Sequence, residues 1–415
     1  MNKQFNVVDL FSGAGGLSEG FRSNKFNIIC HVEMDKDACD TLALRNVYYY
    51  LKHIDNIGLY YDYVNHVIDK NQLMDKIPPY IINNVLNYKI DCNTSQSIYK
   101  YIDDSIGNNS VDGIIGGPPC QAYSIVGRVR NKSKKEHDDR IYLYRYYKDF
   151  INRYKPSFFV FENVKGLLSF RDCSDRLLFP QIINEFSELG YDVTYKVINA
   201  SLYGVPQNRE RVILFGKNRN KNLGDFFKAL ENYTEKPPTI KEIFDDLPFL
   251  KSGDSSNVYS KCCTSNFVKK YYRTTSRSCL TYHSARRNNE NDSEIYKLVV
   301  QYKIHGKSLK YNELPDTLKT HNNVTSFLDR YKALDYDNVS HTVVAHLSKD
   351  GHYYIHPDIL QNRSITVREA ARIQGFPDDF YFENSRTAAF KQIGNAVPPI
   401  LSKKIAQAVV KIFTD

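Results

Sequence analysis

One cysteine stands in a setting that could make its thiol reactive. Cys120 lies in the segment GGPPCQAYS at 116–124, which follows a short apolar run at 113–115 that is typical of a buried strand. A thiol at the carboxyl end of a parallel strand and near a helix start lies where ligands bind and where positive potential favours the thiolate. The pattern predicts a cysteine nucleophile; a thiol that only packs in the core is the alternative.

An acidic side chain follows another run of this kind. Glu162 and Asn163 come directly after the apolar residues 158–161. A carboxylate at a sheet edge is costly to desolvate, and such burial tends to raise its pKa and make it a proton donor. Glu162 is therefore the candidate acid, with a partly solvated glutamate at a strand end as the alternative.

Two arginines alternate just before a third apolar run at 212–215. Arg209 and Arg211 belong to the segment QNRER at 207–211. Alternate positions on a strand face the same side, so we expect the two guanidinium groups to point together as a fork for an anion or a base carbonyl. A ladder of salt bridges with Glu210 fits the same spacing.

A glycine-dense turn separates the first apolar run, at 5–11, from a helix-forming segment at 17–21. Glycines let the backbone approach a ligand, and a helix start presents unpaired N–H groups. Glu33 ends the second apolar run, 20 residues after Gly13, where a carboxylate can accept both ribose hydroxyls. The pattern predicts a nucleoside-cofactor site. Ser18 disfavours NAD, because it replaces the third glycine of the dinucleotide fingerprint, and no Lys-Ser/Thr pair supports ATP.

The elements that must hold these residues alternate between strands and helices. Strands are expected at 5–11, 26–32, 113–115, 158–161, 193–197 and 212–215, and helices at 17–21, 177–189, 367–374 and 401–413. This alternation predicts an α/β fold with a doubly wound, mostly parallel sheet that is covered on both faces.

The length of 415 residues predicts two or three lobes. We expect an α/β domain at 1–217 with an insertion at about 48–88, a loop-rich lobe at 218–361 with short strands at 341–346 and 352–356, and a last segment at 362–415 in which regular patterning resumes.

Composition limits the class of protein. Hydrophobic residues make up 42% and charged residues 25%, as in ordinary globular chains, and the net charge of +9 favours polyanionic partners. No apolar run approaches a membrane span and no signal-like start is present, so we expect a cytoplasmic protein without a membrane partner. The eight cysteines form no CxxC pair, and we expect no metal.

Together and in this order, the motifs resemble those of the DNA cytosine-5 methyltransferases of bacterial restriction-modification systems. The matching segments are DLFSGAGGLSEGF, VEMD, GGPPCQAYS, FENV, QNRERV, ITVREAARIQGFPDDF and KQIGNAVPP. The resemblance implies the Rossmann-like fold of the class I methyltransferases that use S-adenosyl-L-methionine, with a catalytic domain at 1–217 and a smaller, loop-rich target-recognition domain at 218–361. It also implies that the segment at 362–415 returns to the catalytic domain.

The resemblance also implies a cofactor site. Its residues are Phe11, Ser12, Gly13, Ala14, Gly16, Glu33, Met34, Asp91, Cys92, Pro119, Leu143, Asn395 and Ala396. Relatives commonly have an aromatic residue where Met34 stands, so contact with the adenine would be made by a thioether.

In the implied reaction, the Cys120 thiolate adds to C6 of a flipped-out cytosine and makes C5 nucleophilic. Glu162, next to Asn163, would engage N3 and the exocyclic amine, while Arg211 would bind O2 with support from Arg209.

Contacts to double-stranded DNA are implied for a basic segment at 125–139 and for the recognition lobe. The residues assigned to DNA are Gln121, Ser124, Arg128, Arg130 and Thr342. A solvated charge run is the alternative for 125–139. We expect a monomer that can pair functionally with a restriction endonuclease. Two other functions stay open, an RNA cytosine-5 methyltransferase that acts on tRNA and a catalytically silent DNA-binding relative.

Overall fold

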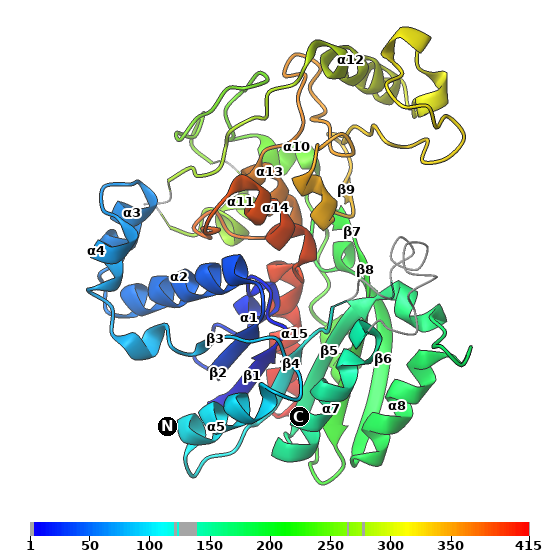
Figure 1. The fold of residues 1–415 in the computed structure, drawn as a ribbon. Helices are drawn as coiled ribbons and strands as arrows, with labels where there is room; N and C mark the ends of the chain where they lie inside the picture. The colour runs from blue at the N-terminus through cyan, green and yellow to red at the C-terminus, as the bar shows by residue number, and fades with distance from the viewer. Residues whose placement is uncertain (1–3, 120–122, 124–138, 264, 276–278, 415) are drawn as a thin grey trace.

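A seven-stranded sheet forms the centre of the protein in the computed structural model, which describes residues 4–119, 123, 139–263, 265–275 and 279–414 (Figure 1). The strand order is β3-β2-β1-β4-β5-β8-β6. Neighbours from β3 to β5 are parallel, whereas β8 is antiparallel to both β5 and β6. The strands are β1 (Phe5–Leu10), β2 (Phe26–Glu33), β3 (Val85–Asn87), β4 (Gly113–Gly116), β5 (Phe158–Val164), β6 (Tyr191–Asn199) and β8 (Glu210–Asn218). The predicted mostly parallel α/β sheet is confirmed.

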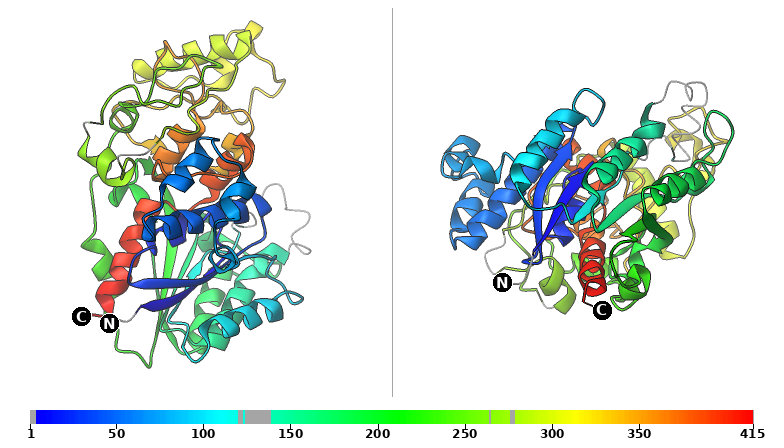
Figure 2. Two further views of the ribbon diagram at one scale, coloured as in Figure 1. Left: turned by 90° about the vertical axis from the view of Figure 1, so that its left-hand side faces the viewer. Right: turned by 90° about the horizontal axis from the view of Figure 1, so that it is seen from below.

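Helices cover both faces of the sheet because successive strand residues point to opposite sides. Val8 and the other strand residues that point the same way face α5 (Ser95–Ile106), α7 (Leu143–Tyr154) and α8 (Leu178–Glu188). Val7 faces the other layer, in which α1 (Gly16–Gly20), α9 (Phe226–Glu231) and α15 (Pro399–Ile412) pack together. Figures 1 and 2 show the two layers. The fold is therefore doubly wound.

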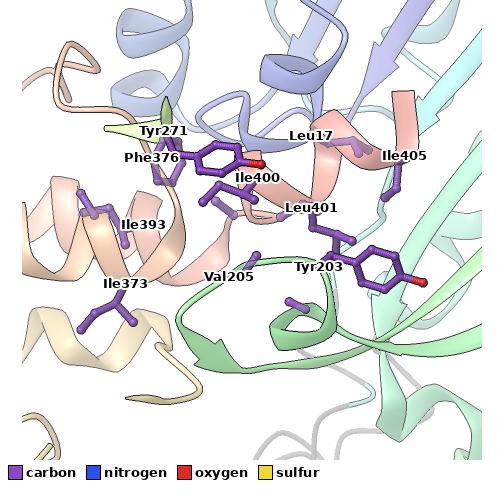
Figure 3. Packing of buried hydrophobic residues seen from close by; sticks show 14 of the residues in the cluster. Leu17, Tyr203, Val205, Tyr271, Ile373, Phe376, Ile393, Ile400, Leu401 and Ile405 are labelled. Atoms are coloured by element: carbon purple, nitrogen blue, oxygen red, sulfur yellow. The ribbon is translucent and has the colours of Figure 1, made fainter. Parts of the chain in front are cut away.

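Helix α15 lies in the layer beside the first strands although it comes near the end of the chain. Leu401 and Ile405 share one apolar cluster with Leu17 of α1 (Figure 3). The ring of Phe413 lies 4.5 Å from that of Phe5. The core of the α/β part is thus completed by the last residues of the chain.

Residues 35–87 build the edge of the sheet that ends in β3. Helix α2 (Lys36–His53) begins at Asp35, whose side chain accepts from the amides of Asp37 and Ala38. Helices α3 (Gly58–Val64) and α4 (Lys70–Met74) and the 3₁₀ turn η1 (Pro79–Ile81) lie between α2 and the edge strand β3. The stretch expected as an insertion, at about 48–88, therefore begins with the end of α2 and ends with β3, a strand of the main sheet.

The lobe that follows β8 contains mostly short elements. These are α10 (Ile240–Phe244), α11 (Asn266–Tyr271), α12 (Glu290–Ile304), the 3₁₀ turns η6 (Tyr311–Glu313), η7 (Asp316–Leu318) and η8 (Ala345–Ser348), and the two-residue strand β9 (Ser340–His341). Strand β9 pairs with β7 (Gln207–Asn208), a two-residue strand just before β8. Before β8, the described residues also include the 3₁₀ turns η3 (Asp139–Tyr142), η4 (Lys165–Ser169) and η5 (Ala200–Leu202).

The prediction of strands at 341–346 and 352–356 is wrong. Only His341 of the first lies in a strand, and the second contributes isolated bridges at Ile355. Side chains take the backbone groups that a ladder would use, because the Tyr354 hydroxyl donates to the Thr342 carbonyl and accepts from the Val344 amide. A strand cannot extend where its peptide groups are already bonded in this way.

The returning segment forms α13 (Val367–Gln374) and α14 (Arg386–Asn395) before α15. Thr366 and Glu369 form a capping box at the start of α13, as its sequence favours. The spans predicted for α13 and α15 are confirmed to within two residues. None of the described helices is long and apolar enough to cross a membrane.

Candidate active site and cofactor site

The chain reverses its winding direction between β1 and β4, the two strands at the centre of the sheet. The chain leaves β1 for α1 on one face, whereas α7, the helix directly before β5, lies on the opposite face. In open α/β sheets this switch point leaves a crevice outside the carboxyl ends of the strands, where ligands bind. The glycine turn and the segment before Cys120 both start at this edge.

The glycine turn after β1 has one open side and one packed side. Phe11, Gly13 and Gly15 have φ angles of 55°, 54° and 84°, so the backbone is left-handed at three positions of the turn. A Cβ at Gly13 would meet nothing within 4 Å, whereas one at Gly16 would lie 2.3 Å from the Val397 carbonyl oxygen. Gly13 therefore faces the space open to a ligand, and Gly16 is required for packing. Ser12 and Ala14 are buried beside them.

Glu33 holds the end of β2 to this turn. One carboxylate oxygen accepts from the Gly13 amide at 2.8 Å, and the other accepts from the Met34 and Asp35 amides, each at 2.8 Å. Burial raises the pKa of Glu33, and the three N–H donors oppose that effect. A carboxylate has about four lone-pair sites, so capacity for one further hydrogen bond remains.

The other predicted cofactor residues lie in neighbouring loops. Met34 is 61% exposed beside Glu33. Asp91 stabilises the turn before α5, where it accepts from the amides of Asn93 and Thr94, and Cys92 is exposed. Leu143 is buried at the start of α7, and Pro119 follows β4. No hydrogen bond recorded between described residues joins Asp91 to Glu33.

Asn395 and Ala396 come from the far end of the sequence. Asn395 is exposed as the last residue of α14, and Ala396 is buried. Lys391 of the same helix forms an ion pair with Asp35 at 2.5 Å. This pair joins α14 to the loop that carries Glu33 and Met34, and so brings the late and early cofactor candidates to one edge of the sheet.

Glu162 and Arg211 face each other across two paired strands. The guanidinium Nε of Arg211 lies 3.0 Å from a carboxylate oxygen of Glu162, and the side chains are 13% and 15% exposed. Arg211 also donates to the Glu210 carbonyl. Neither side chain is fully buried, so part of the pair is accessible. An acid and a guanidinium group side by side can bind a polar heterocycle at two edges.

Asn163 fixes the segment that leads to Cys120. It is 1% exposed, and its amide donates to the Pro118 carbonyl at 3.1 Å. A Cβ at Gly117 would lie 2.5 Å from the Glu162 carbonyl oxygen, so the two segments touch. Cys120, Gln121, Ser124, Arg128 and Arg130 lie outside the residues that the structure describes.

Arg209 does not form the predicted fork with Arg211. It is buried between β7 and β8, and its guanidinium donates to the carbonyls of Val343 and Ala396 at 2.7 and 3.0 Å. The alternation rule fails because Arg209 lies outside the β8 ladder, where the side chain turns toward the returning segment.

Thr342 lines a cleft that lies mostly in the lobe at 218–361. Its hydroxyl donates to the Asn208 carbonyl at 2.5 Å. The cleft has a volume of about 910 Å³ and mixes cationic, acidic, histidine and tyrosine side chains. Lining residues include Asn208, Thr342, Lys303, Arg330, Lys332 and Tyr353.

Sequence reasoning missed two glutamines and an ion pair. Gln207 and Gln374 are fully buried and bond to each other at 2.5 Å, next to Arg209. A glutamine directly before the two arginines was the one available signal for this contact. Nothing local in the sequence indicates that Lys391 pairs with Asp35, since 356 positions separate them.

The strand order and the edge site define the fold of the class I methyltransferases. A solved structure of a protein encoded in an E. coli prophage and described as a DNA modification methyltransferase covers 99% of this chain and all of its own, with a TM-score of 0.67 and 22% identity. An Entamoeba histolytica methyltransferase, EhMeth, has the same fold with a TM-score of 0.53 at 16% identity, covering 100% of this chain and 99% of its own.

The family follows from the sequence comparisons. The profile of the C-5 cytosine-specific DNA methylases matches residues 5–68 and 55–411. The chain belongs to this family and is a DNA cytosine-5 methyltransferase.

Its relatives include type II methyltransferases. The type II methyltransferase M.Bpa9945I of Bacillus paralicheniformis is 41% identical, with 98% of this chain and 99% of the relative covered. M.DdeI of Desulfomicrobium norvegicum is 29% identical, with 99% and 89% covered.

Proposed function

We propose that the protein transfers a methyl group from S-adenosyl-L-methionine to C5 of a flipped-out cytosine in a specific double-stranded DNA sequence, through a covalent bond between Cys120 and C6. The observation that carries this proposal is the half-open pair of Glu162 and Arg211, which lies beside the Pro118 segment that Asn163 holds.

The residues at the glycine turn fit the cofactor. The space over Gly13 is open, and Glu33 keeps acceptor capacity for a ribose hydroxyl. The exposed thioether of Met34 is available to an adenine face. Phe11, Ser12, Ala14, Gly16, Asp91, Cys92, Pro119, Leu143, Asn395 and Ala396 complete the proposed site. When bound, S-adenosylmethionine supplies the methyl group.

The base is held by the charged pair. Glu162 engages N3 and the exocyclic amine, and Arg211 binds O2, so charge that develops on the ring is offset at both edges. The Cys120 thiolate adds to C6, C5 becomes nucleophilic, and loss of the C5 proton after methylation expels the thiolate. Asn163 acts by positioning the segment that carries the cysteine.

The recognition lobe reads the DNA. We assign cofactor and base chemistry to residues 1–217 and 362–415, and sequence readout to residues 218–361. The cleft that starts at Asn208 and Thr342 offers both donors and acceptors, as base edges require. Extrusion of the target base costs about a few kcal/mol, which contacts from Gln121, Ser124, Arg128 and Arg130 would offset.

A protective role follows by analogy. The similarity to type II methyltransferases supports a role in shielding DNA from a cognate endonuclease, with no stable complex between the two proteins. One flipped base requires one chain, so we propose a monomer.

The test is methyl transfer from labelled S-adenosylmethionine to duplex DNA or to tRNA. We expect label in DNA, and a loss of at least about 10⁴-fold in Cys120→Ala. Bisulfite sequencing of DNA from an expressing host would identify the methylated sequence. Label in tRNA alone, or full turnover by Cys120→Ala, would contradict the proposal.

A further inference from the structure

Arg209 is one of the largest side chains in the interior of the protein, with 1% of its surface exposed. Its guanidinium group donates to the carbonyl of Val343 at 2.7 Å and to the carbonyls of Ala396 and Gly394 at 3.0 and 3.3 Å. A buried charge is expensive to desolvate, so it must be held by several hydrogen bonds at once. Here those bonds reach two segments that lie about 50 residues apart in the sequence.

Two glutamines close this arrangement into a ring. Gln207 accepts from the Val343 amide at 3.0 Å and donates to Gln374 at 2.5 Å. Gln374 donates in turn to the Ala396 carbonyl at 2.5 Å. Val343 is thus held at its N–H and at its C=O, and the Ala396 carbonyl accepts from both Arg209 and Gln374. We call Arg209, Gln207 and Gln374 the interlobe clamp.

The interlobe clamp lies between the two regions that the proposed reaction must bring together. Val343 follows Thr342, which lines the cleft that we propose reads the DNA. Ala396 follows Asn395, which is exposed at the edge where the cofactor is proposed to bind. The clamp therefore connects the recognition segment at 340–344 to the end of α14 at 394–396 by direct hydrogen bonds.

We propose that Arg209 is a positioning residue that couples cofactor binding at residues 394–396 to the order of the recognition segment at 340–344. This inference rests on the proposed function. The planar guanidinium group has five donors in a fixed fork, so it can serve carbonyls on both segments, whereas the compact ammonium of lysine cannot reproduce that geometry. Because coupling is reciprocal, DNA at the recognition segment raises cofactor affinity by the same factor.

Hydrogen exchange on the full-length protein tests the coupling without DNA and without turnover. The probe is S-adenosylhomocysteine, with binding measured by calorimetry. In the wild type we expect the ligand to slow exchange in peptides over the glycine turn, over 392–397 and also over 340–346, the last by roughly fivefold or more. In Arg209→Lys we expect the first two effects to remain and the effect at 340–346 to disappear.

Two further variants make the result specific. Arg219→Lys is the matched control, because Arg219 is exposed just after β8 and pairs with Asp192. It should behave as the wild type. Gln374→Met removes the hydrogen bonds of Gln374 to Gln207 and to the Ala396 carbonyl at similar side-chain volume. It tests the coupling independently if Arg209→Lys does not fold. We expect it, too, to lose the effect at 340–346.

The outcomes separate this inference from the proposed function. If the ligand protects the glycine turn but leaves exchange at 340–346 unchanged in the wild type, or protects 340–346 equally in both clamp variants, the coupling is wrong and the proposed function stands. If S-adenosylhomocysteine gives neither binding heat nor protection at the glycine turn, both are overturned.

Discussion

Glu162 and Arg211 show how a charged pair can be kept both ordered and accessible. Each side chain restrains the other through one contact of 3.0 Å, and each keeps more than a tenth of its surface exposed. A fully buried pair would need to break before it could bind a base, at a cost of several kcal/mol. The half-open pair can exchange one contact for two contacts with a ligand.

The charge of Glu162 is expected to matter more than its shape. Glu162→Gln keeps the volume of the side chain and can still accept from Arg211. Its amide, however, cannot donate a proton to the ring and so offset the charge that develops there. We expect methyl transfer to fall by at least about 100-fold, with the free energy of unfolding changed by less than about 1 kcal/mol. Labelled-methyl assays and urea unfolding measure the two effects.

Glu210 offers a matched control on the adjacent strand. It is half exposed and pairs with Lys165 at 2.9 Å. Glu210→Gln removes the same charge from the same region and should leave methyl transfer within about twofold of the wild type. Equal losses in the two variants would mean that Glu162 acts only through the general field of the site.

At the scale of elements, the turn between β1 and α1 performs two tasks with two glycines. Gly13 leaves space for a ligand, and Gly16 lets α1 approach the chain that enters α15. The two positions differ in what a Cβ would meet and in backbone conformation, because only Gly13 has a positive φ.

Alanine at these two positions is expected to separate stability from binding. Gly16→Ala places a Cβ 2.3 Å from the Val397 carbonyl oxygen, so we expect a loss of about 1–3 kcal/mol in the free energy of unfolding. Gly13→Ala meets no atom but must adopt a φ near 54°, which costs about 1 kcal/mol. Its main effect should be weaker binding of S-adenosylhomocysteine, measured by calorimetry. Equal cofactor affinity in the two variants would contradict this division.

The central strands could be predicted from the sequence because their apolar runs are continuous and end at glycine or charged residues. The edge strand β3 could not, since its three residues are held mainly by pairing with β2. The same holds for the segment at 340–346, where Gln207, Arg209 and Tyr354 decide the backbone conformation from elsewhere in the chain.

The candidate site divides in a similar way. Motif positions predicted Glu162, Arg211 and Glu33, because each lies directly beside an apolar run: Glu33 and Glu162 at the end of theirs, and Arg211 just before its own. The partners of Arg209 could not be foreseen, since strand alternation describes only residues inside a ladder. Helix α12 was not predicted, because the sequence around it is polar. Its Asn289 cap and the paired apolar residues at 295–296 and 299–300 nevertheless favour a helix.

At the scale of the whole molecule, buried charges hold the returning segment in place. All eight residues of α13 are buried, including Arg372, which pairs with Asp246 at 2.5 Å and with Asp378 at 2.6 Å. Arg372 holds the pKa of Asp378 down to about 2 although burial opposes this. The stability from Asp378 is therefore present above about pH 4 and is lost as the pH falls toward 2.

Buried histidines should make the protein sensitive to milder acid. Burial and Lys332 lower the pKa of His341 to about 4, from an ordinary value of 6.5. Below pH 6.5 the unfolded chain binds a proton that the folded protein does not, so the free energy of unfolding falls between pH 6.5 and 4, by about 1.4 kcal/mol per pH unit for one full proton.

His341→Gln is expected to reduce this slope by close to one proton, as measured by urea unfolding from pH 7 to pH 4. His53→Gln, at an exposed helix end, serves as the control and should follow the wild type. An unchanged slope in His341→Gln would show that other groups cause the acid sensitivity.

Helix α15 has a consequence for how the protein is made. It covers an apolar groove on α1 and α9, and the amide of Gly224 donates to the carbonyl of Ile412 at its end. On the ribosome the first strands emerge early, yet this groove stays uncovered until α15 has also left the exit tunnel. The nascent chain therefore exposes the apolar faces of α1 and α9 for as long as the residues of α15 are still inside the ribosome, and we expect it to bind chaperones during that interval.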